Sequence, residues 1–478
     1  MMPAARENIE ARVFTAAAII WAAVVFLSLR FHFLDPLIPT TWHGRMGFDF
    51  FAVPRAFINL RHGVSIYATR ACAYGPYSTW YPYHPALALL AGSWLSLFPP
   101  WGAFWVFAAA SVAALALCAR LLGGLCPDSS SRGFLYFLFL FPLPVYLMIW
   151  NGQMHVFLVA AFALMLYDLL LQTRGDVKDG LRPWLLAGIL LSLFSKPLVL
   201  LALPALAAVK ACRKTLLWAL LTYALVSVLF IIVPALNPQG IGIAALLDVA
   251  AHPDRMFRFQ TYNGVRLMTY RPEVLGDNAI HWLNMRFRSQ VSQPQHFELM
   301  ALPSFVEDIF GVALPGFLLK LPALLILGLS VALLRITDAA ARAKGAIYVV
   351  ALTGLAFFVS YQTVYEYHYA MLLPGIASLV ILFNAEKDAV SLPLIKCYCA
   401  AGAMLLVPTS YYFLSNRAYG FHRAITATMN DVYVAVFTGG HIYDWALPLM
   451  RLNRVLPAAL MFVLAFALGC RLVLREGE

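Results

Sequence analysis

The feature that most constrains this chain is a long series of nearly uninterrupted apolar segments. A helix that crosses the hydrocarbon core of a bilayer needs about 20 predominantly apolar residues. Only 12% of the residues are charged, whereas a soluble domain has about 25%. The sequence therefore predicts a polytopic membrane protein whose backbone polar groups are satisfied inside helices. The clear candidates for membrane-spanning helices are 13–31, 102–122, 133–149, 153–172, 214–234, 315–334, 346–362, 369–384, 393–413 and 455–474.

Two further apolar segments leave alternatives open. Segment 84–98 stops at Phe98-Pro99-Pro100 and is either re-entrant or interfacial, or it crosses the bilayer against the charge rule. Segment 184–208 is interrupted at Lys196-Pro197, so it forms either two short helices or one kinked helix. With these segments included, we expect an all-α bundle of roughly eleven to thirteen transmembrane helices, with juxtamembrane helices in its outer loops. The whole chain, 1–478, is expected to form a single integral membrane domain.

The basic residues indicate topology. The net charge is +11, but the cations cluster in short loops between apolar runs, which is the positive-inside pattern of membrane proteins rather than a nucleic-acid surface. We expect loops 174–182, 210–214 and 335–344 to share the cytoplasmic side. The long loops are usually the functional ones. The outer loops are then 32–83, 235–314, 363–368 and 414–452.

The first outer loop contains two acids, Asp35 and Asp49. Asp35 precedes a proline and is typical of a turn. Asp49 is flanked by aromatic residues, and a carboxylate in such surroundings is costly unless it is paired or used. We therefore take Asp49 as the candidate general base. The alternatives for Asp49 are a helix N-cap or an ion pair with Arg45 or Arg55.

A short amphipathic helix is predicted directly after Asp49. Pro54 suits a first helical turn, and Gly63 suits a C-terminal cap. Val53, Phe57 and Leu60 recur at helical spacing. This apolar face is expected to lie on the bilayer surface.

Lys196 is the most isolated charge in an apolar segment. It lies in LLSLFSKPLVLL with no acid nearby in the sequence. A lone lysine at membrane depth costs on the order of 2.5–3.5 kcal/mol, so a partner is expected. An anionic lipid phosphate is one candidate partner, and snorkelling to the headgroups is the alternative.

Three polar and aromatic clusters complete the candidate site residues. Each is a candidate contact for a sugar or an acceptor, because polar groups at membrane depth face either protein or a cavity. The alternatives are an aromatic belt at the membrane interface or hydrogen bonds between helices. The clusters supply Tyr81 and His84, then Asn151, Gln153 and His155, and finally Glu366 and His368.

Five short motifs carry a resemblance to a known family. In order along the chain they are Asp49 with Gly63-x-x-x-Tyr67, Tyr81-Pro82-x-x-Pro85, Asn151-Gly152-Gln153, Lys196-Pro197, and His368 with Leu372-Leu373-Pro374. Together they resemble the GT-C superfamily of membrane glycosyltransferases, and most of all glycosyltransferase family 87, which includes polyprenyl-phosphate-mannose-dependent mannosyltransferases. The sequence departs from the family in offering one convincing acid in the first loop, and in reading Val364-Tyr365-Glu366-Tyr367 before His368.

The resemblance implies an inverting, metal-independent hexosyltransferase that uses no cofactor. Its catalytic acid falls on Asp49, its donor phosphate site on Lys196, and its late histidine on His368. The sugar, mannose or another hexose or pentose, would move from a polyprenyl-phosphate to a lipid or glycan hydroxyl. We expect Arg55 and Arg266 to add contacts to the donor phosphate. The expected location is the bacterial inner membrane, with the active site facing the periplasm.

Three rival functions remain open from the sequence. One is a structural subunit of an envelope complex, which would not need Asp49 or Lys196. A transporter or flippase of lipid-linked sugars would also need many helices and isolated charges, and it predicts broken helices in paired repeats. An O-antigen ligase or polymerase would use a lipid-diphosphate sugar, and the long loop 235–314 suits such an enzyme. Nucleic acid is not an expected partner.

Overall fold

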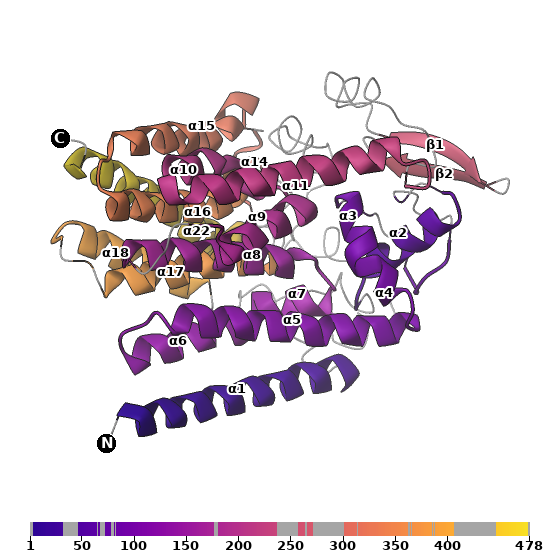
Figure 1. The fold of residues 1–478 in the computed structure, drawn as a ribbon, viewed down its shortest axis with the longest axis horizontal. Coiled ribbons are helices and arrows are strands. Elements are labelled where there is room, and N and C mark those ends of the chain that lie inside the picture. The colour runs from indigo at the N-terminus through magenta and orange to yellow at the C-terminus, as the bar shows by residue number, and fades with distance from the viewer. Residues whose placement is uncertain are drawn as a thin grey trace.

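The computed structural model is a bundle of helices that run roughly parallel to one axis (Figure 1). Nine helices in the described part of the chain are long and apolar enough to cross a membrane, which confirms the prediction of a polytopic helical membrane protein. The structure describes residues 3–31, 46–64, 66, 72–77, 81, 83–175, 180–236, 257–262, 265–270, 301–312, 314–361, 364, 366–384, 386, 388–405 and 446–476. The predicted roles of Asp35 and Arg45 and most of loop 414–452 therefore lie outside the described residues.

The longer elements follow the predicted apolar segments. The segment 133–149 is divided into two helices, α6 and α7, at Pro142. The last span begins earlier than predicted, because α22 already starts at Ala446. The helices are α1 (Pro3–Phe31), α5 (Pro100–Gly123), α6 (Ser129–Leu140), α7 (Leu143–Trp150), α8 (His155–Thr173), α11 (Arg213–Ile232), α15 (Gly316–Ala332), α16 (Ala339–Ser360), α17 (Leu373–Phe383), α18 (Ser391–Met404) and α22 (Ala446–Glu476). Short 3₁₀ segments are η8 (Leu333–Arg335) and η9 (Glu366–Leu372), which precedes α17.

The segment 84–98 matches the alternative in which it is re-entrant or interfacial. It forms α3 (Pro85–Leu87), the π-helical η3 (Ala88–Gly92) and α4 (Ser93–Leu95). Eleven helical residues rise only about 16 Å, about half of the hydrocarbon thickness. The segment packs instead against α2 (Ala52–Arg61) at one end of the bundle (Figure 1). The contact is close, because a Cβ at Gly92 would lie 2.6 Å from the carbonyl oxygen of Val53.

Helix α2 confirms the prediction of a short helix after Asp49. It ends at Arg61, and Gly63 follows with a φ of +66°. The expected orientation on the bilayer surface is wrong, since Val53 is fully buried and Leu60 is 8% exposed. The physical reason is the packing partner: the apolar face of α2 packs against η3 and α4.

The segment 184–208 is a broken hairpin that enters and leaves at the same end of the bundle. It consists of α9 (Pro183–Ser195), η4 (Leu198–Leu201), α10 (Leu203–Ala208) and η5 (Lys210–Cys212). Its two ends meet, because the backbone N–H of Arg182 donates to Oγ1 of Thr215 at 3.0 Å. Lys196 lies at the break with an extended backbone, φ −136° and ψ 116°, because a residue before proline avoids the helical region.

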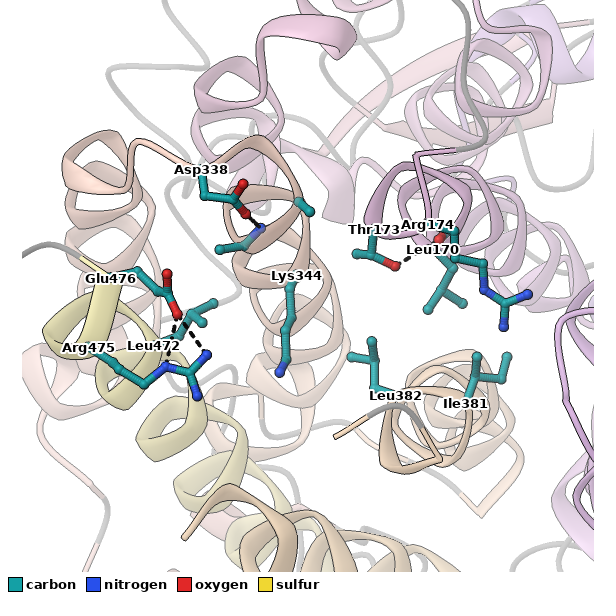
Figure 2. Close-up of a pocket in the computed structure, with 12 residues that line it drawn as sticks. Leu170, Thr173, Arg174, Asp338, Lys344, Ile381, Leu382, Leu472, Arg475 and Glu476 are labelled. Atoms are coloured by element: carbon teal, nitrogen blue, oxygen red, sulfur yellow. Dashed lines mark hydrogen bonds and ion pairs between the residues drawn. The ribbon is translucent and has the colours of Figure 1, made fainter. Parts of the chain in front are cut away.

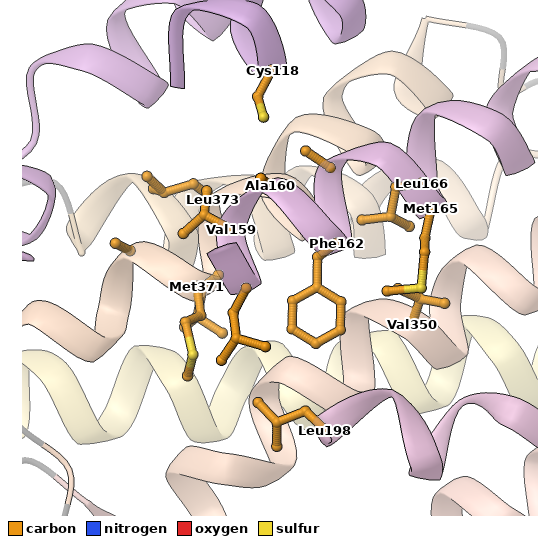
Figure 3. Close-up of a cluster of buried hydrophobic side chains, with 14 of the residues drawn as sticks. Cys118, Val159, Ala160, Phe162, Met165, Leu166, Leu198, Val350, Met371 and Leu373 are labelled. Atoms are coloured by element: carbon orange, nitrogen blue, oxygen red, sulfur yellow. The ribbon is translucent and has the colours of Figure 1, made fainter. Parts of the chain in front are cut away.

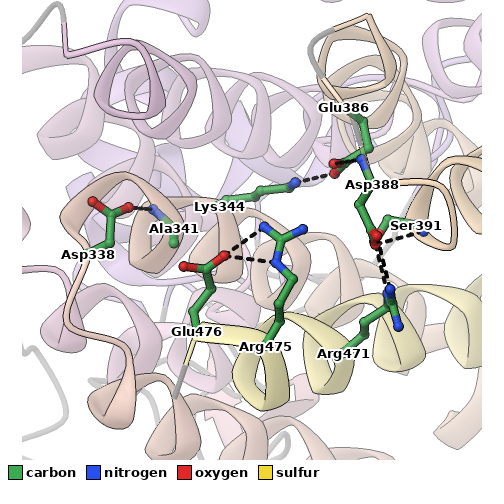
Figure 4. A network of polar contacts seen from close by, with 9 residues as sticks. All are labelled: Asp338, Ala341, Lys344, Glu386, Asp388, Ser391, Arg471, Arg475 and Glu476. Carbon is green, nitrogen blue, oxygen red and sulfur yellow. Dashed lines mark hydrogen bonds and ion pairs between the residues drawn. The ribbon is translucent and has the colours of Figure 1, made fainter. Parts of the chain in front are cut away.

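The loops that the positive-inside rule groups together do share one end of the bundle, which we call the basic end. There Arg174, Lys344 and Arg475 line one pocket of about 310 Å³ (Figure 2). Ion pairs connect the elements around it: Lys344 pairs with Glu386, and Arg471 Nε lies 2.7 Å from Asp388 Oδ2 (Figure 4).

The core is centred on α8 and α16. In the most apolar stretch of α16, 94% of the residues are buried, whereas in that of α1 only 28% are. Helix α16 is therefore central and α1 peripheral. Phe162 of α8 packs in a cluster with Leu198 and Val350, all three nearly fully buried (Figure 3). The broken hairpin is therefore held inside the protein beside α8 and α16.

Loop 235–314 contains the local exception to the helical prediction. Strands β1 (Phe257–Tyr262) and β2 (Val265–Tyr270) pair antiparallel, with Phe257 opposite Tyr270 and Tyr262 opposite Val265. In the sequence Asn263-Gly264 separates the two strands, and this dipeptide between β-branched and aromatic residues is a strong hairpin signal. The same loop also carries α14 (Leu302–Phe310).

Candidate active site

Asp49 is brought to the end of α7 by backbone contacts between two distant turns. Gly47 N–H donates to the carbonyl of Trp150 at 2.8 Å, and Asp49 N–H donates to the carbonyl of Asn151 at 3.2 Å. Gly152 has a φ of +70°, and a Cβ on it would lie 2.4 Å from Cβ of Phe50. Only glycine permits both the conformation and the approach. The first loop and the Asn151-Gly152-Gln153 turn therefore form one unit.

Two side-chain amides hold the Asp49 carboxylate. Nδ2 of Asn151 donates to Asp49 Oδ2 at 3.2 Å, and Nε2 of Gln153 donates to the same oxygen. Burial raises the pKa of Asp49 from 3.8 to about 6, while Lys196 and the two amides oppose the rise. Asp49 is thus ionised at neutral pH and has a pKa close to the working range of a general base.

The two structural alternatives for Asp49 find no support in the described residues. The N-cap of α2 is Phe51, and no side chain caps that helix. Arg55 points to another partner, since its Nη1 donates to the carbonyl of Tyr77 at 2.8 Å. Burial lowers the pKa of Arg55 to about 10, and Cys72 opposes this change.

Lys196 reaches the same place from the tip of the broken hairpin. Its Nζ lies 2.7 Å from Nε2 of His155, the first residue of α8. Nδ1 of His155 in turn lies 2.9 Å from Oε1 of Gln153. Lys196 is partly exposed and also contributes to the electrostatic environment of Asp49. The hairpin thus delivers a cation to the carboxylate that the first loop supplies.

His368 joins this group through ring contacts. Its ring centroid lies 4.4 Å from that of His155 and 5.0 Å from that of Phe357. The Phe357 ring also contacts Lys196, whose Nζ is 5.9 Å from the ring centroid. Six of the residues selected from the sequence therefore converge at one end of the bundle: Asp49, Asn151, Gln153, His155, Lys196 and His368.

Glu366 faces a different partner, which the sequence reading missed. Its Oε1 accepts from Nε of Arg454 at 2.8 Å and from Nη2 at 2.5 Å. Arg454 is completely buried and Glu366 is 4% exposed. The pair ties η9, which carries His368, to α22. The sequence signals only that each of these two charges, standing in or beside an apolar segment, requires a partner, and it does not say which partner.

Tyr81 and His84 hold the start of α3 rather than the carboxylate. Nδ1 of His84 accepts from the backbone N–H of Ala86 at 3.1 Å, and its Nε2 lies 3.0 Å from Oγ of Ser227. The hydroxyl of Tyr81 donates to the carbonyl of His84 at 2.8 Å.

Tyr83 stands between these two residues in the sequence and interacts electrostatically with Asp49. Burial raises the pKa of Tyr83 above its usual range, and the Asp49 charge raises it further. Sequence reasoning did not separate Tyr83 from its neighbours, because three aromatic residues stand close together there. Arg266 lies in β2, and its side chain is outside the described part.

A protein-family model described as Glycosyltransferase family 87 matches residues 81–287 of the chain. The chain resembles glycosyltransferase family 87. This confirms the resemblance that the five motifs carry, and it supports glycosyl transfer as the activity. The matched segment of this family 87-like chain contains Asn151, Gln153, His155 and Lys196, whereas Asp49 and His368 lie outside it.

Two solved structures are also similar to the family 87-like chain. The crystal structure of ArnT from Cupriavidus metallidurans in the apo state is 15% identical, with a TM-score of 0.41, and the match covers 96% of this chain and 78% of that chain. The structure of the same protein bound to undecaprenyl phosphate is 16% identical, with a TM-score of 0.38, and the match covers 97% and 78%. No curated protein matches this sequence.

Proposed function

We propose that this protein transfers a sugar from a polyprenyl-phosphate donor to a hydroxyl of a lipid or glycan acceptor. One observation carries the proposal. The only acid of the first loop that the structure describes and the lysine at the break of the α9 hairpin meet around His155 and Gln153. A base and a cation are the two groups that a displacement at a phosphate-bearing carbon requires.

The proposed reaction is a single displacement. Asp49 takes the proton of the acceptor hydroxyl while that oxygen attacks the anomeric carbon. The bond from this carbon to the phosphate oxygen breaks, and its electron pair leaves with the polyprenyl phosphate. Lys196 stabilises the charge on the departing phosphate by a charge-assisted hydrogen bond. One displacement inverts the anomeric carbon, and the ammonium supplies the charge stabilisation that a metal would otherwise provide.

The charge distribution supports a periplasmic active site. The loops rich in arginine and lysine lie at the basic end, and such loops are cytoplasmic in membrane proteins. Helices α2, α3 and α4 lie at the opposite end (Figure 1), and Asp49 closely precedes α2 in the chain. We therefore propose that the donor and acceptor meet at the outer face of a bacterial inner membrane.

The direct test uses the purified protein in lipid nanodiscs with a radiolabelled polyprenyl-phosphate sugar and total envelope lipid as acceptor. Lys196→Gln should raise the KM for the donor at least about 10-fold, the equivalent of one lost charge-assisted contact. The control is Lys320→Gln, since Lys320 is an exposed lysine of α15. Equal donor KM values for both variants and the wild type would contradict the phosphate role of Lys196.

The same labelled lipid, supplied to the protein in sealed liposomes, separates the rival functions. Movement of the labelled lipid across the bilayer without a new glycoside would support a transporter and overturn the proposal. Transfer from a lipid-diphosphate sugar, with none from the monophosphate, would support a ligase or polymerase instead. For the proposed enzyme, kcat/KM should rise as the pH increases through about 6, because only ionised Asp49 accepts a proton.

A further inference from the structure

Lys196 and Asp49 are joined by an unbroken chain of hydrogen-bonded side chains. Lys196 Nζ contacts His155 Nε2 at 2.7 Å, and His155 Nδ1 contacts Gln153 Oε1 at 2.9 Å. Gln153 Nε2 then donates to Asp49 Oδ2. Gln153 and His155 are 3% and 1% exposed, so the middle of this series of contacts is shielded from water. Two side chains expected to bind a sugar thus lie between the cation and the base.

The donor and acceptor atoms of these side chains determine the direction of each hydrogen bond between them. An ammonium only donates, so Nε2 of His155 accepts, and the ring proton of the neutral imidazole resides on Nδ1. That N–H can only donate to the amide oxygen of Gln153, which leaves the amide NH₂ to face the carboxylate. Every donor therefore points toward Asp49, and reversal of the imidazole or the amide would break two contacts at once.

We propose that Gln153 and His155 are positioning residues, which orient the Asp49 carboxylate for proton abstraction and link it to donor binding at Lys196. The inference rests on the proposed function. Because the ammonium that binds His155 is also the proposed phosphate ligand, the arrival of the donor acts on Asp49 through this chain. No net proton moves along it, since an amide stands in the middle. Hydrogen bonds in a water-poor site of this kind reinforce one another.

Titratable groups from several elements surround the hydrogen-bonded side chains. In the described part, the titratable groups that face Asp49 are Lys196 and Tyr83. Those that face the His155 ring are Lys196, Tyr367 and His368. The two rings of η9 pack against the imidazole and restrict its rotation. They leave the two nitrogens of His155 to Gln153 and Lys196.

The test compares kcat, donor KM and the pH profile of sugar transfer in the intact protein. His155→Phe keeps the ring but removes both nitrogens, and Gln153→Met keeps the length but removes the amide. We expect kcat to fall by about 10- to 100-fold, as for a misplaced catalytic group, with no rise in donor KM. Because the Gln153 hydrogen bond lowers the pKa of Asp49, Gln153→Met should also move the acidic limb of kcat/KM to higher pH.

Two further variants separate positioning from loss of structure. His155→Asn retains one donor and one acceptor and should recover part of the kcat lost in His155→Phe. Phe162→Leu weakens the packing of the same helix, α8, and should lower thermal stability without moving the acidic limb. Wild-type kcat and an unmoved limb in both His155→Phe and Gln153→Met would overturn the positioning role and leave the proposed function intact. A wild-type protein that transfers no sugar would instead overturn the proposed function, and this inference with it.

Discussion

Replacement of Asp49 by asparagine should make the protein more stable at neutral pH while it strongly slows sugar transfer. Burial raises the pKa of Asp49 from 3.8 to about 6. Each pKa unit corresponds to about 1.36 kcal/mol, so keeping the carboxylate ionised in the folded protein costs at most about 3 kcal/mol. This value already includes the opposing effects of Lys196, Asn151 and Gln153. The base is thus maintained at the expense of stability.

The sign of the pH dependence follows from linkage. A carboxyl with a raised pKa binds its proton more tightly in the folded state, so it stabilises the protein below pH 3.8 and loses that effect as the pH rises through about 6. Asp49→Asn removes this loss. The variant should therefore melt above the wild type at pH 8, and the difference should close toward pH 4. Removal of a general base should lower kcat by about 10²- to 10⁴-fold.

Thermal unfolding of detergent-solubilised protein between pH 4 and pH 8 measures the effect. A matched control has the opposite sign: Arg471 and Ser391 lower the pKa of Asp388, so this carboxylate stabilises the fold when ionised, above its unfolded pKa. Asp388→Asn should therefore melt below the wild type across the whole range. The reasoning would be refuted by an Asp49→Asn protein whose melting difference does not change with pH, and the base assignment by one that retains transfer.

Two other predictions concern the backbone and the buried ion pair. Gly63→Ala should lower the free energy of unfolding by about 1–2 kcal/mol, because Gly63 has a φ of +66° but open space around it. Gly152→Ala should lower it more and also reduce sugar transfer, because its Cβ would lie 2.4 Å from Phe50. Equal losses of melting temperature in the two variants would argue against the close approach at Gly152. Glu366→Gln and Arg454→Met should each destabilise the protein by about 3–5 kcal/mol, because each leaves a buried group without its charged partner. The double variant should melt at a higher temperature than either single variant. Additive losses of melting temperature would show that the two side chains, 2.5 Å apart, are not coupled.

Much of the membrane architecture could be predicted from residue order. An apolar run of spanning length has no stable alternative to a helix in lipid, and for this reason the long helices coincide with the predicted segments. The candidate residues could also be found, because a lone charge or amide in an apolar run is costly. Lys196, His155 and Asp49 each carry this cost, and the cost marks them in the sequence.

Which groups meet could not be read from the sequence. Glu366 and Arg454 are paired because α22 packs beside η9, a contact between segments with no local signal in either. The order of Tyr81, Tyr83 and His84 in the sequence also does not indicate which of these side chains turns toward Asp49. Pro197 predicted a break in segment 184–208, but only the contact of Arg182 with Thr215 shows that the chain returns to the end at which it entered.

The sequence by itself determined where this chain is apolar, where it is charged and which polar groups need a partner, because the cost of a group in lipid depends mainly on its own chemistry. Tertiary structure alone decided the partners. Long-range pairing depends on helix packing and on two glycine-permitted approaches, and neither leaves a periodic mark in the residues. The carboxylate, the amide, the imidazole and the ammonium are each visible in the sequence, but their connection exists only in the folded protein.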